Sequence, residues 1–170
     1  YVISPYFLRY GRSKLLKIIA KENPDIVVFT GDLIDASRNE NITESIQFLE
    51  RLAINIPVYY IRGNHEYNSS QYKEILRQLR EAKGNFHFLD GGYRKITIKN
   101  QNIYILGLDI IKEANMNHFL VQQGYQIILN HHSENFSENM DLSQLGADLV
   151  LTGHAHGGQW RLPILGGVYA

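Results

Sequence analysis

The sequence predicts an α/β fold built in layers, with a mixed β-sheet or sheets flanked by helices. Short runs of β-branched residues alternate with amphipathic stretches along most of the chain, as in βαβ units. Closely spaced strands near the middle of the chain add an antiparallel portion. The chain has 170 residues, of which 44% are hydrophobic, so it can bury a sizeable core. We expect residues 1–170 to form a single domain.

Helices and strands alternate in the first half of the chain. Residues 12–22 form the first expected helix, because their leucines and isoleucines lie on one face and Asn23-Pro24 ends the pattern. Residues 25–30 are typical of a buried strand, since the run is apolar without alternation. The other expected elements of this half are helices at 43–53 and 72–82 and a strand at 57–61.

The second half of the chain has more strands. Residues 87–89, 93–98 and 102–106 are expected strands separated by short turns, which favours antiparallel pairing. Residues 113–123 are a candidate helix. Two further apolar strands are expected at 126–129 and 148–151.

Composition and charge exclude several classes of protein. The formal net charge is zero, which argues against the broad basic surface that grips nucleic acid. The absence of cysteine excludes disulfides, thiolate catalysis and cysteine-ligated zinc sites. No apolar run approaches the roughly 18 residues that span a bilayer, and no signal peptide is recognisable. Tyr1–Ser4 already has the character of a strand, so we expect the chain to begin inside the fold, with any anchor upstream.

Four of the expected strands end in polar residues. The four segments are Gly31-Asp32 with Asp35, Gly63-Asn64-His65-Glu66, Asn130-His131-His132, and Gly153-His154-Ala155-His156. Sites in α/β sheets form at the carboxyl ends of strands, which share one edge. Each segment alone is most simply a turn, but imidazole, carboxylate and amide oxygen together are ligands for Zn, Mn and Fe(II). A carboxylate such as Asp32 can bridge two cations, and two cations about 3.5–4 Å apart can clamp a phosphate.

These segments resemble the motifs of the calcineurin-like metallophosphoesterase superfamily. The pattern of that family is Asp-x-His, Gly-Asp, Gly-Asn-His-Asp/Glu, a lone His and Gly-His-x-His, and its last four elements occur here in order. Residues 24–35 and 146–163 are similar to the bacterial YkuE/YaeI-type phosphoesterases. The resemblance implies a layered metallophosphoesterase-like fold with mixed sheets flanked by helices.

The resemblance also implies a set of ligands for two divalent metal ions, which would be Mn, Zn or Fe. The expected metal ligands are Asp32, Asn64, His131, His154 and His156. Asp32 would bridge the two ions, and His156 would belong to the second ion. We prefer His131 to His132 as the lone ligand because it lies nearer the end of the strand.

The implied function is hydrolysis of a phosphate mono- or diester by a metal-bound hydroxide at a dinuclear site. His65 would be catalytic, since it would lie beside the phosphate and assist the leaving oxygen, and Asp35 would orient it. Two alternatives stay open: a binding scaffold that has lost catalysis, and a mononuclear zinc hydrolase. Two, none or one metal ion per chain would separate the three. Similar proteins are often tied to the cell envelope, so the resemblance points to envelope or membrane association, with a cytoplasmic location as the alternative.

The chain departs from the family pattern in two ways. The Asp-x-His motif should follow the first strand, but Ser4 is followed by Pro5 and neither ligand is present. The family also continues beyond the point that corresponds to Ala170. We therefore expect the chain to be incomplete at both ends, and we expect residues to be missing at Ser4–Pro5 and near residues 109–111. Neighbouring Cα atoms much farther apart than about 3.8 Å would reveal such omissions.

Overall fold

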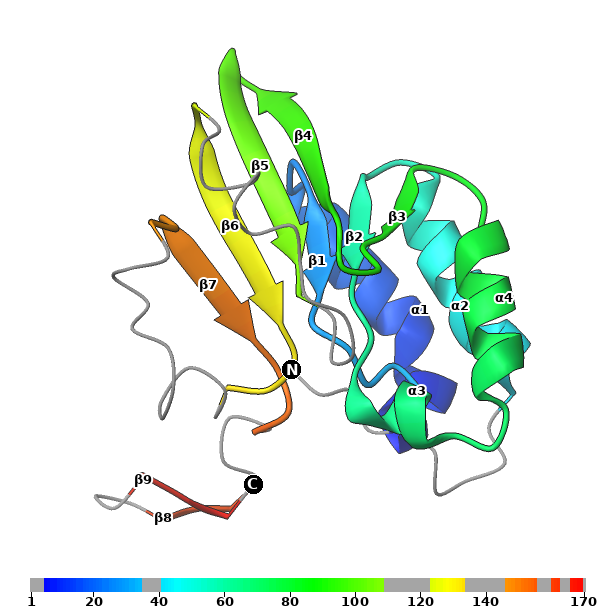
Figure 1. Ribbon diagram of the computed structural model, residues 1–170. Coiled ribbons are helices and arrows are strands. Elements are labelled where there is room, and N and C mark those ends of the chain that lie inside the picture. Colours follow the sequence, from blue (N-terminus) through cyan, green and yellow to red (C-terminus); the bar gives the residue numbers. More distant parts are fainter. Residues whose placement is uncertain are drawn as a thin grey trace.

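The computed structural model describes residues 5–34, 41–108, 123–133, 146–155, 160–162 and 166–169 (Figure 1). The helices are α1 (Pro5–Glu22), α2 (Ile42–Ala53), α3 (Asn64–Asn68) and α4 (Tyr72–Glu81). The strands are β1 (Val27–Phe29), β2 (Val58–Tyr60), β3 (Phe86–Phe88), β4 (Tyr93–Ile98), β5 (Gln101–Gly107), β6 (Tyr125–Asn130), β7 (Leu149–Thr152), β8 (Trp160–Leu162) and β9 (Gly166–Tyr169).

The helices follow the sequence prediction with two differences. Helices α2 and α4 agree with the prediction to within one residue at each end. Helix α1 begins at Pro5 rather than at residue 12, because proline suits the first turn of a helix, where the backbone N–H has no partner. The prediction lacks the short helix α3, since its sequence Asn-His-Glu-Tyr-Asn has no apolar period. No bilayer-spanning helix is found among the described helices.

The first sheet has the order β1-β2-β3, and all three strands are parallel. The predicted antiparallel pairing of residues 87–89 is therefore wrong. β3 pairs with β2 in parallel, with Val58 opposite Phe86. The physical reason is the connection: α3 and α4 lie between β2 and β3 and supply the crossover that a parallel pair requires.

The second sheet has the order β4-β5-β6-β7 and is mixed. β4 and β5 form the predicted antiparallel pair, with Tyr93 opposite Leu106. β6 and β7 join β5 in parallel, with Asn130 at the end of β6 opposite Thr152 at the end of β7. β8 and β9 form a two-stranded antiparallel sheet.

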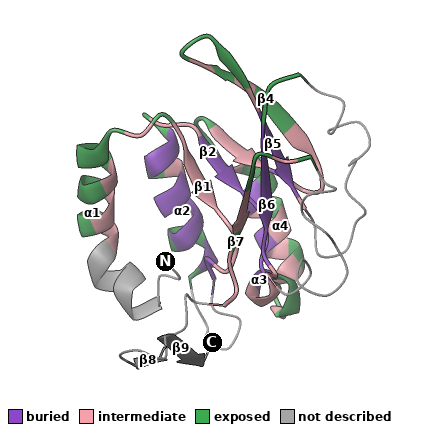
Figure 2. Ribbon diagram, turned by 90° about the vertical axis from the view of Figure 1, so that its left-hand side faces the viewer, coloured by how far each residue is buried: buried purple, intermediate pink, exposed green. Residues whose placement is uncertain are grey.

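The two larger sheets and the helices form layers. Figure 1 shows α1, α2 and α4 on one side of the first sheet and the second sheet on its other side. Successive residues of β2, and Ile61 directly after it, pack alternately against the two layers. Tyr60 packs with the helices. Tyr59 and Ile61 pack with the second sheet, against Ile105 and Leu129. Figure 2 shows buried residues gathered in α2, β2, β5 and β6. The predicted layered α/β fold with mixed sheets is confirmed.

This arrangement brings the carboxyl ends of β1, β2, β6 and β7 to one edge of the molecule, where each ends in one of the polar segments. Hydrogen bonds between Thr30, Asn64, His131 and His154 join the four strand ends. The predicted strand 1–4, the candidate helix 113–123, and the junctions at Ser4 and at residues 109–111 lie outside the described residues.

Candidate metal centre

Two loops that contain glycine bring Asp32 and Asn64 together. Gly31-Asp32 follows β1, and Gly63-Asn64 follows β2, its parallel neighbour. The backbone of Asp32 is left-handed, with a φ of 56°, which Asp tolerates better than most residues. A Cβ atom on Gly63 would lie 2.0 Å from Asp32 Oδ1. Glycine at position 63 therefore allows the Asp32 carboxylate to approach the second loop.

His131 reaches the same place from the end of β6. Its side chain is 1% exposed, and its Nδ1 lies 2.6 Å from the carbonyl oxygen of Thr30. Because a carbonyl oxygen only accepts, Nδ1 carries a proton and donates a hydrogen bond to the Thr30 oxygen. The other ring nitrogen, Nε2, lies 2.8 Å from Asn64 Oδ1 and 3.1 Å from Asp32 Oδ2. The bond to the backbone thus fixes the ring and aims Nε2 at the two oxygens.

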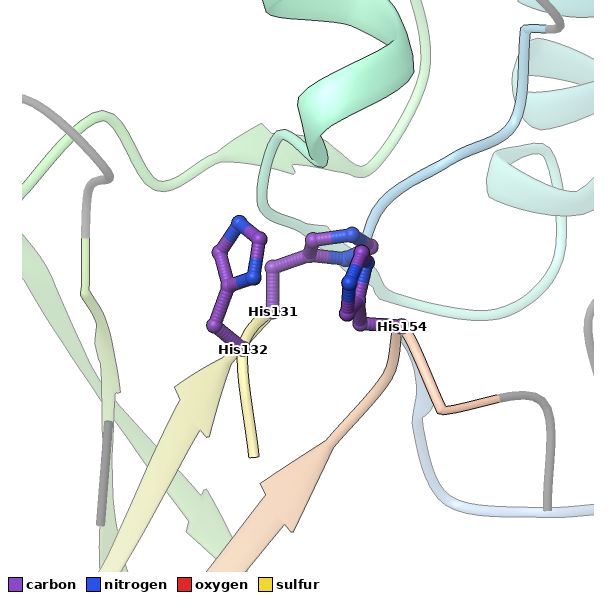
Figure 3. A group of neighbouring side chains, drawn as sticks. All are labelled: His131, His132 and His154. Atoms are coloured by element: carbon purple, nitrogen blue, oxygen red, sulfur yellow. The ribbon is translucent and has the colours of Figure 1, made fainter. Parts of the chain in front are cut away.

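His154 completes the cluster from the end of β7. Its backbone is left-handed, with a φ of 62°, and its Nδ1 lies 2.9 Å from Asn64 Oδ1. Figure 3 shows the rings of His131 and His154 close together, with His132 beside them. The ring centroids of His132 and His154 are 4.4 Å apart, and one ring nitrogen from each of the three histidines lies within 4.8 Å of the others. The geometry thus adds His132 to the site, although the sequence analysis preferred His131.

The atoms that converge here suit a single cation. They are Asp32 Oδ2, Asn64 Oδ1, His131 Nε2 and His154 Nδ1. Asn64 Oδ1 lies 2.8 Å from His131 Nε2 and 2.9 Å from His154 Nδ1. His131 Nε2 lies 3.1 Å from Asp32 Oδ2. These distances are close to the spacing of neighbouring ligands around an ion with bonds of about 2.0–2.1 Å. Asp32 Oδ2 is buried; it forms an ion pair with His131 Nε2 at 3.1 Å but accepts no hydrogen bond from the described residues. A buried oxygen in that state costs free energy, and a divalent cation would satisfy it.

The charges of Asp32 and His131 depend on each other. Burial raises the pKa of Asp32, but the contact with His131, the backbone N–H of His65 and the charges of both histidines outweigh burial and lower that pKa below 3.8. Burial lowers the pKa of His131, but the contacts with Asp32 and with the Thr30 carbonyl outweigh it and raise that pKa above 6.5. An ionised Asp32 beside a protonated His131 is therefore favoured, and a cation bound at the same place would have to displace the proton of His131.

Comparisons with known proteins identify the family. Residues 7–158 match the model of the family described as Calcineurin-like phosphoesterase. The chain belongs to this family. Calcineurin-like phosphoesterases are metal-dependent hydrolases of phosphoric esters, so the resemblance found in the sequence motifs is confirmed.

Relatives and solved structures agree with this membership. The metallophosphoesterase YkuE of Bacillus subtilis is 28% identical, over 96% of this chain and 58% of its own length. The chain thus spans little more than half of that relative. A probable glycerophosphodiester phosphodiesterase, GpdQ of Arcobacter nitrofigilis, is 33% identical over 52% of the chain and 29% of its own length. The structure of the NAD nucleotidase NadN of Haemophilus influenzae has the same fold, with a TM-score of 0.55 and 18% identity over 85% of this chain and 32% of its own.

The remaining site residues of this calcineurin-like phosphoesterase are placed as follows. His65 is the second residue of α3, and its backbone N–H donates to Asp32 Oδ1 at 2.9 Å. Asp35 and His156 lie outside the described residues, so their predicted roles stay predictions. Glu66, to which the sequence analysis assigned no role, is fully buried behind the site. The only sequence signal for it is its place at the end of the Gly-Asn-His-Asp/Glu motif.

Proposed function

We propose that the chain hydrolyses a phosphate mono- or diester at a centre of two divalent cations, Mn, Zn or Fe. The observation that carries the proposal is the convergence of four ligand atoms from four strand ends, one of them the buried Asp32 Oδ2 that accepts no hydrogen bond from the described residues. Asn64, His131 and His154 would hold one cation together with Asp32. His156 would serve the second cation, whose other ligands in the family belong to the Asp-x-His motif that is missing between Ser4 and Pro5.

Asp32 is suited to the bridging role. Its Oδ1 is held by the backbone N–H of His65 at 2.9 Å, which leaves Oδ2 as the oxygen offered to cations. The depressed pKa of Asp32 keeps the carboxylate ionised, as a metal ligand must be. The Thr30 carbonyl contributes by holding His131 in the tautomer whose Nε2 can bind a cation.

Bound cations would neutralise the phosphoryl oxygens and lower the pKa of a nucleophilic water. The protein supplies the rest of the chemistry. His65 follows the ligand Asn64 at the start of α3, and we propose that its imidazole donates a proton or hydrogen bond to the leaving oxygen. Asp35 would orient that imidazole.

We also propose that the chain forms one domain and that the whole protein is associated with the cell envelope.

A mononuclear hydrolase is the second candidate. The observation that favours it is that Asp32, Asn64, His131 and His154 already make a complete four-atom set for one ion. The similarity to GpdQ supports a phosphodiester as substrate in either case. Membership of a hydrolase family weighs against a binding scaffold without catalysis.

Metal content and a panel of esters test the proposal. The chain is treated with chelator, supplied with Mn²⁺, Zn²⁺ or Fe²⁺ in turn, and assayed with p-nitrophenyl phosphate and bis-p-nitrophenyl phosphate. We expect two ions per chain and hydrolysis of at least one ester. One ion with activity would establish the mononuclear alternative, and no metal with no activity would establish the scaffold.

A matched pair of histidine variants makes the experiment specific. His131→Ala removes a proposed ligand, and we expect it to abolish metal binding. His87→Ala removes a histidine of β3 whose ring stacks on Tyr59 at a centroid distance of 4.9 Å. We expect the His87 variant to bind metal as the parent does.

A further inference from the structure

The carboxylate of Glu66 joins the two loops that carry Asp32 and Asn64. Glu66 is 0% exposed. Its Oε2 accepts hydrogen bonds from the backbone N–H groups of Asp32 and Gly63, at 2.9 and 2.8 Å. Its Oε1 accepts from the backbone N–H of Ile34 at 2.9 Å. One side chain of α3 therefore accepts from three amides, two of which belong to the loop after β1.

The same two loops are joined in the opposite direction by Asp32. Its Oδ1 accepts from the backbone N–H of His65, so each loop offers a carboxylate to the backbone of the other. Hydrogen bonds from backbone amides to an ionised carboxylate are stronger than those between neutral groups. Because Asp32 has a left-handed backbone, its orientation depends on contacts of this kind.

We propose that Glu66 is a positioning residue, which holds the backbone of Asp32 so that Oδ2 faces the cation site before any cation binds. The inference rests on the proposed function, since it assigns Glu66 a task in building that metal centre. Glu66 itself touches neither cation nor substrate. Its effect passes through the amides of Asp32, Ile34 and Gly63 to the ligands Asp32 and Asn64.

The substitution Glu66→Gln tests this proposal with little change in volume. A glutamine has one acceptor oxygen, and its NH2 group only donates, so at least one of the three amides would face a donor instead of an acceptor. We expect the affinity for Mn²⁺ to fall about 10–100-fold, as when an outer partner of a metal ligand is removed. Calorimetry measures that affinity on the folded, chelator-treated chain, and the electron paramagnetic resonance spectrum of bound Mn²⁺ reports any change in coordination.

Glu50→Gln is the matched control. Glu50 also accepts a backbone N–H, that of Lys83 at 2.9 Å, but it lies at the carboxyl end of α2, away from the site. We expect the control to bind Mn²⁺ with unchanged affinity. Equal affinity and an unchanged spectrum for Glu66→Gln would overturn the positioning role and leave the proposed function intact. A parent chain that binds none of Mn²⁺, Zn²⁺ and Fe²⁺ would instead overturn the proposed function and the inference with it.

Amide hydrogen exchange of the parent chain decides the matter if Glu66→Gln does not fold. The proposal requires the loops to be ordered before metal binds. We therefore expect the amides of Asp32, Ile34 and Gly63 to be protected in the chelator-treated chain. Exchange of these three amides at the rate of exposed loop amides would overturn the proposal.

Discussion

The two ends of the strands carry similar ion pairs in opposite surroundings. At the carboxyl end, His131 Nε2 lies 3.1 Å from Asp32 Oδ2, and the two side chains are 1% and 5% exposed. At the amino end, Lys99 Nζ lies 3.3 Å from Asp25 Oδ2, and the two side chains are 81% and 54% exposed. The second pair borders a shallow groove of about 300 Å³ that Pro57 and Tyr59 help to line. The distances are nearly equal, so burial is the difference between them.

Burial decides what each pair can do. Water and salt screen the exposed pair, and such pairs contribute little to stability. The buried pair is shielded from solvent, so each of its polar atoms needs a partner from the protein or a cation. Buried polar atoms without partners raise the free energy of the folded chain, and a bound cation removes that cost. The buried site is therefore the one that favours binding of an ion. The following predictions test this contrast, from the largest expected effect to the smallest.

Asp32→Ala should have the largest effect. It removes the proposed bridging ligand, so we expect the chain to lose its bound metal and its ester hydrolysis together. Elemental analysis and the ester assay measure both. Circular dichroism checks that the variant is folded. An Asp32→Ala chain that kept two ions and the parent activity would show that the roles are wrongly assigned.

His65→Ala should separate metal binding from turnover. His65 is proposed to assist the leaving oxygen and not to bind metal, so we expect the metal content to stay unchanged. The value of kcat should fall by about 10²–10⁴-fold, the usual contribution of a general acid. His87→Ala serves as the control for loss of a histidine. Loss of metal from the His65 variant would make it a ligand instead.

A rise in pH should increase the affinity of the chain for metal and decrease the stability of the metal-free chain. The pKa of His131 is raised above 6.5, so its stabilising charge is fully present below pH 6.5 and is lost as the pH rises through the raised value. The pKa of Asp32 is lowered below 3.8, so its contribution is present above pH 3.8 and is lost as the pH falls through the lowered value.

We therefore expect the thermal stability of the chelator-treated chain to receive less from this pair at pH 8.5 than at pH 6. Affinity for Mn²⁺ should rise over the same interval, because the cation displaces the proton of His131. Denaturation and calorimetry at both pH values measure the two trends. In His131→Ala, the contribution of this pair to the pH dependence should disappear. Metal affinity that did not change with pH would contradict the shared place of proton and cation.

Lys99→Ala should have the smallest effect. The exposed pair with Asp25 should change the free energy of unfolding by less than about 1 kcal/mol. Urea denaturation measures it at low and at high salt, and the difference from the parent should shrink as salt is added. Metal binding should be unaffected. A change of several kcal/mol would mean that exposure does not distinguish the two ends.

Sequence reasoning found much of the candidate site because the site is built at strand ends. Apolar runs locate the strands, and the polar residues that follow Thr30, Ile61, Leu129 and Leu151 then lie at one edge of the fold. Glu66 and His132 received no role, for different reasons. Glu66 acts on backbone amides of a loop more than thirty positions earlier in the chain, and no local pattern records such a bond. His132 follows His131 directly in the chain, but it is half-buried and its ring lies at 86° to that of His131, a difference that the order of residues does not show.

By itself, the sequence determined the α/β class, the positions of most helices and strands within a few residues, and the order of the polar segments. These depend on local periodicity and on turn residues, which act over a few positions. Only the tertiary structure decided that β3 joins β2 in parallel, that the strands divide into separate sheets, and that the Asp32 carboxylate faces His131. Those features depend on contacts between segments far apart in the chain, where many pairings satisfy the same local pattern and burial of the whole core selects one.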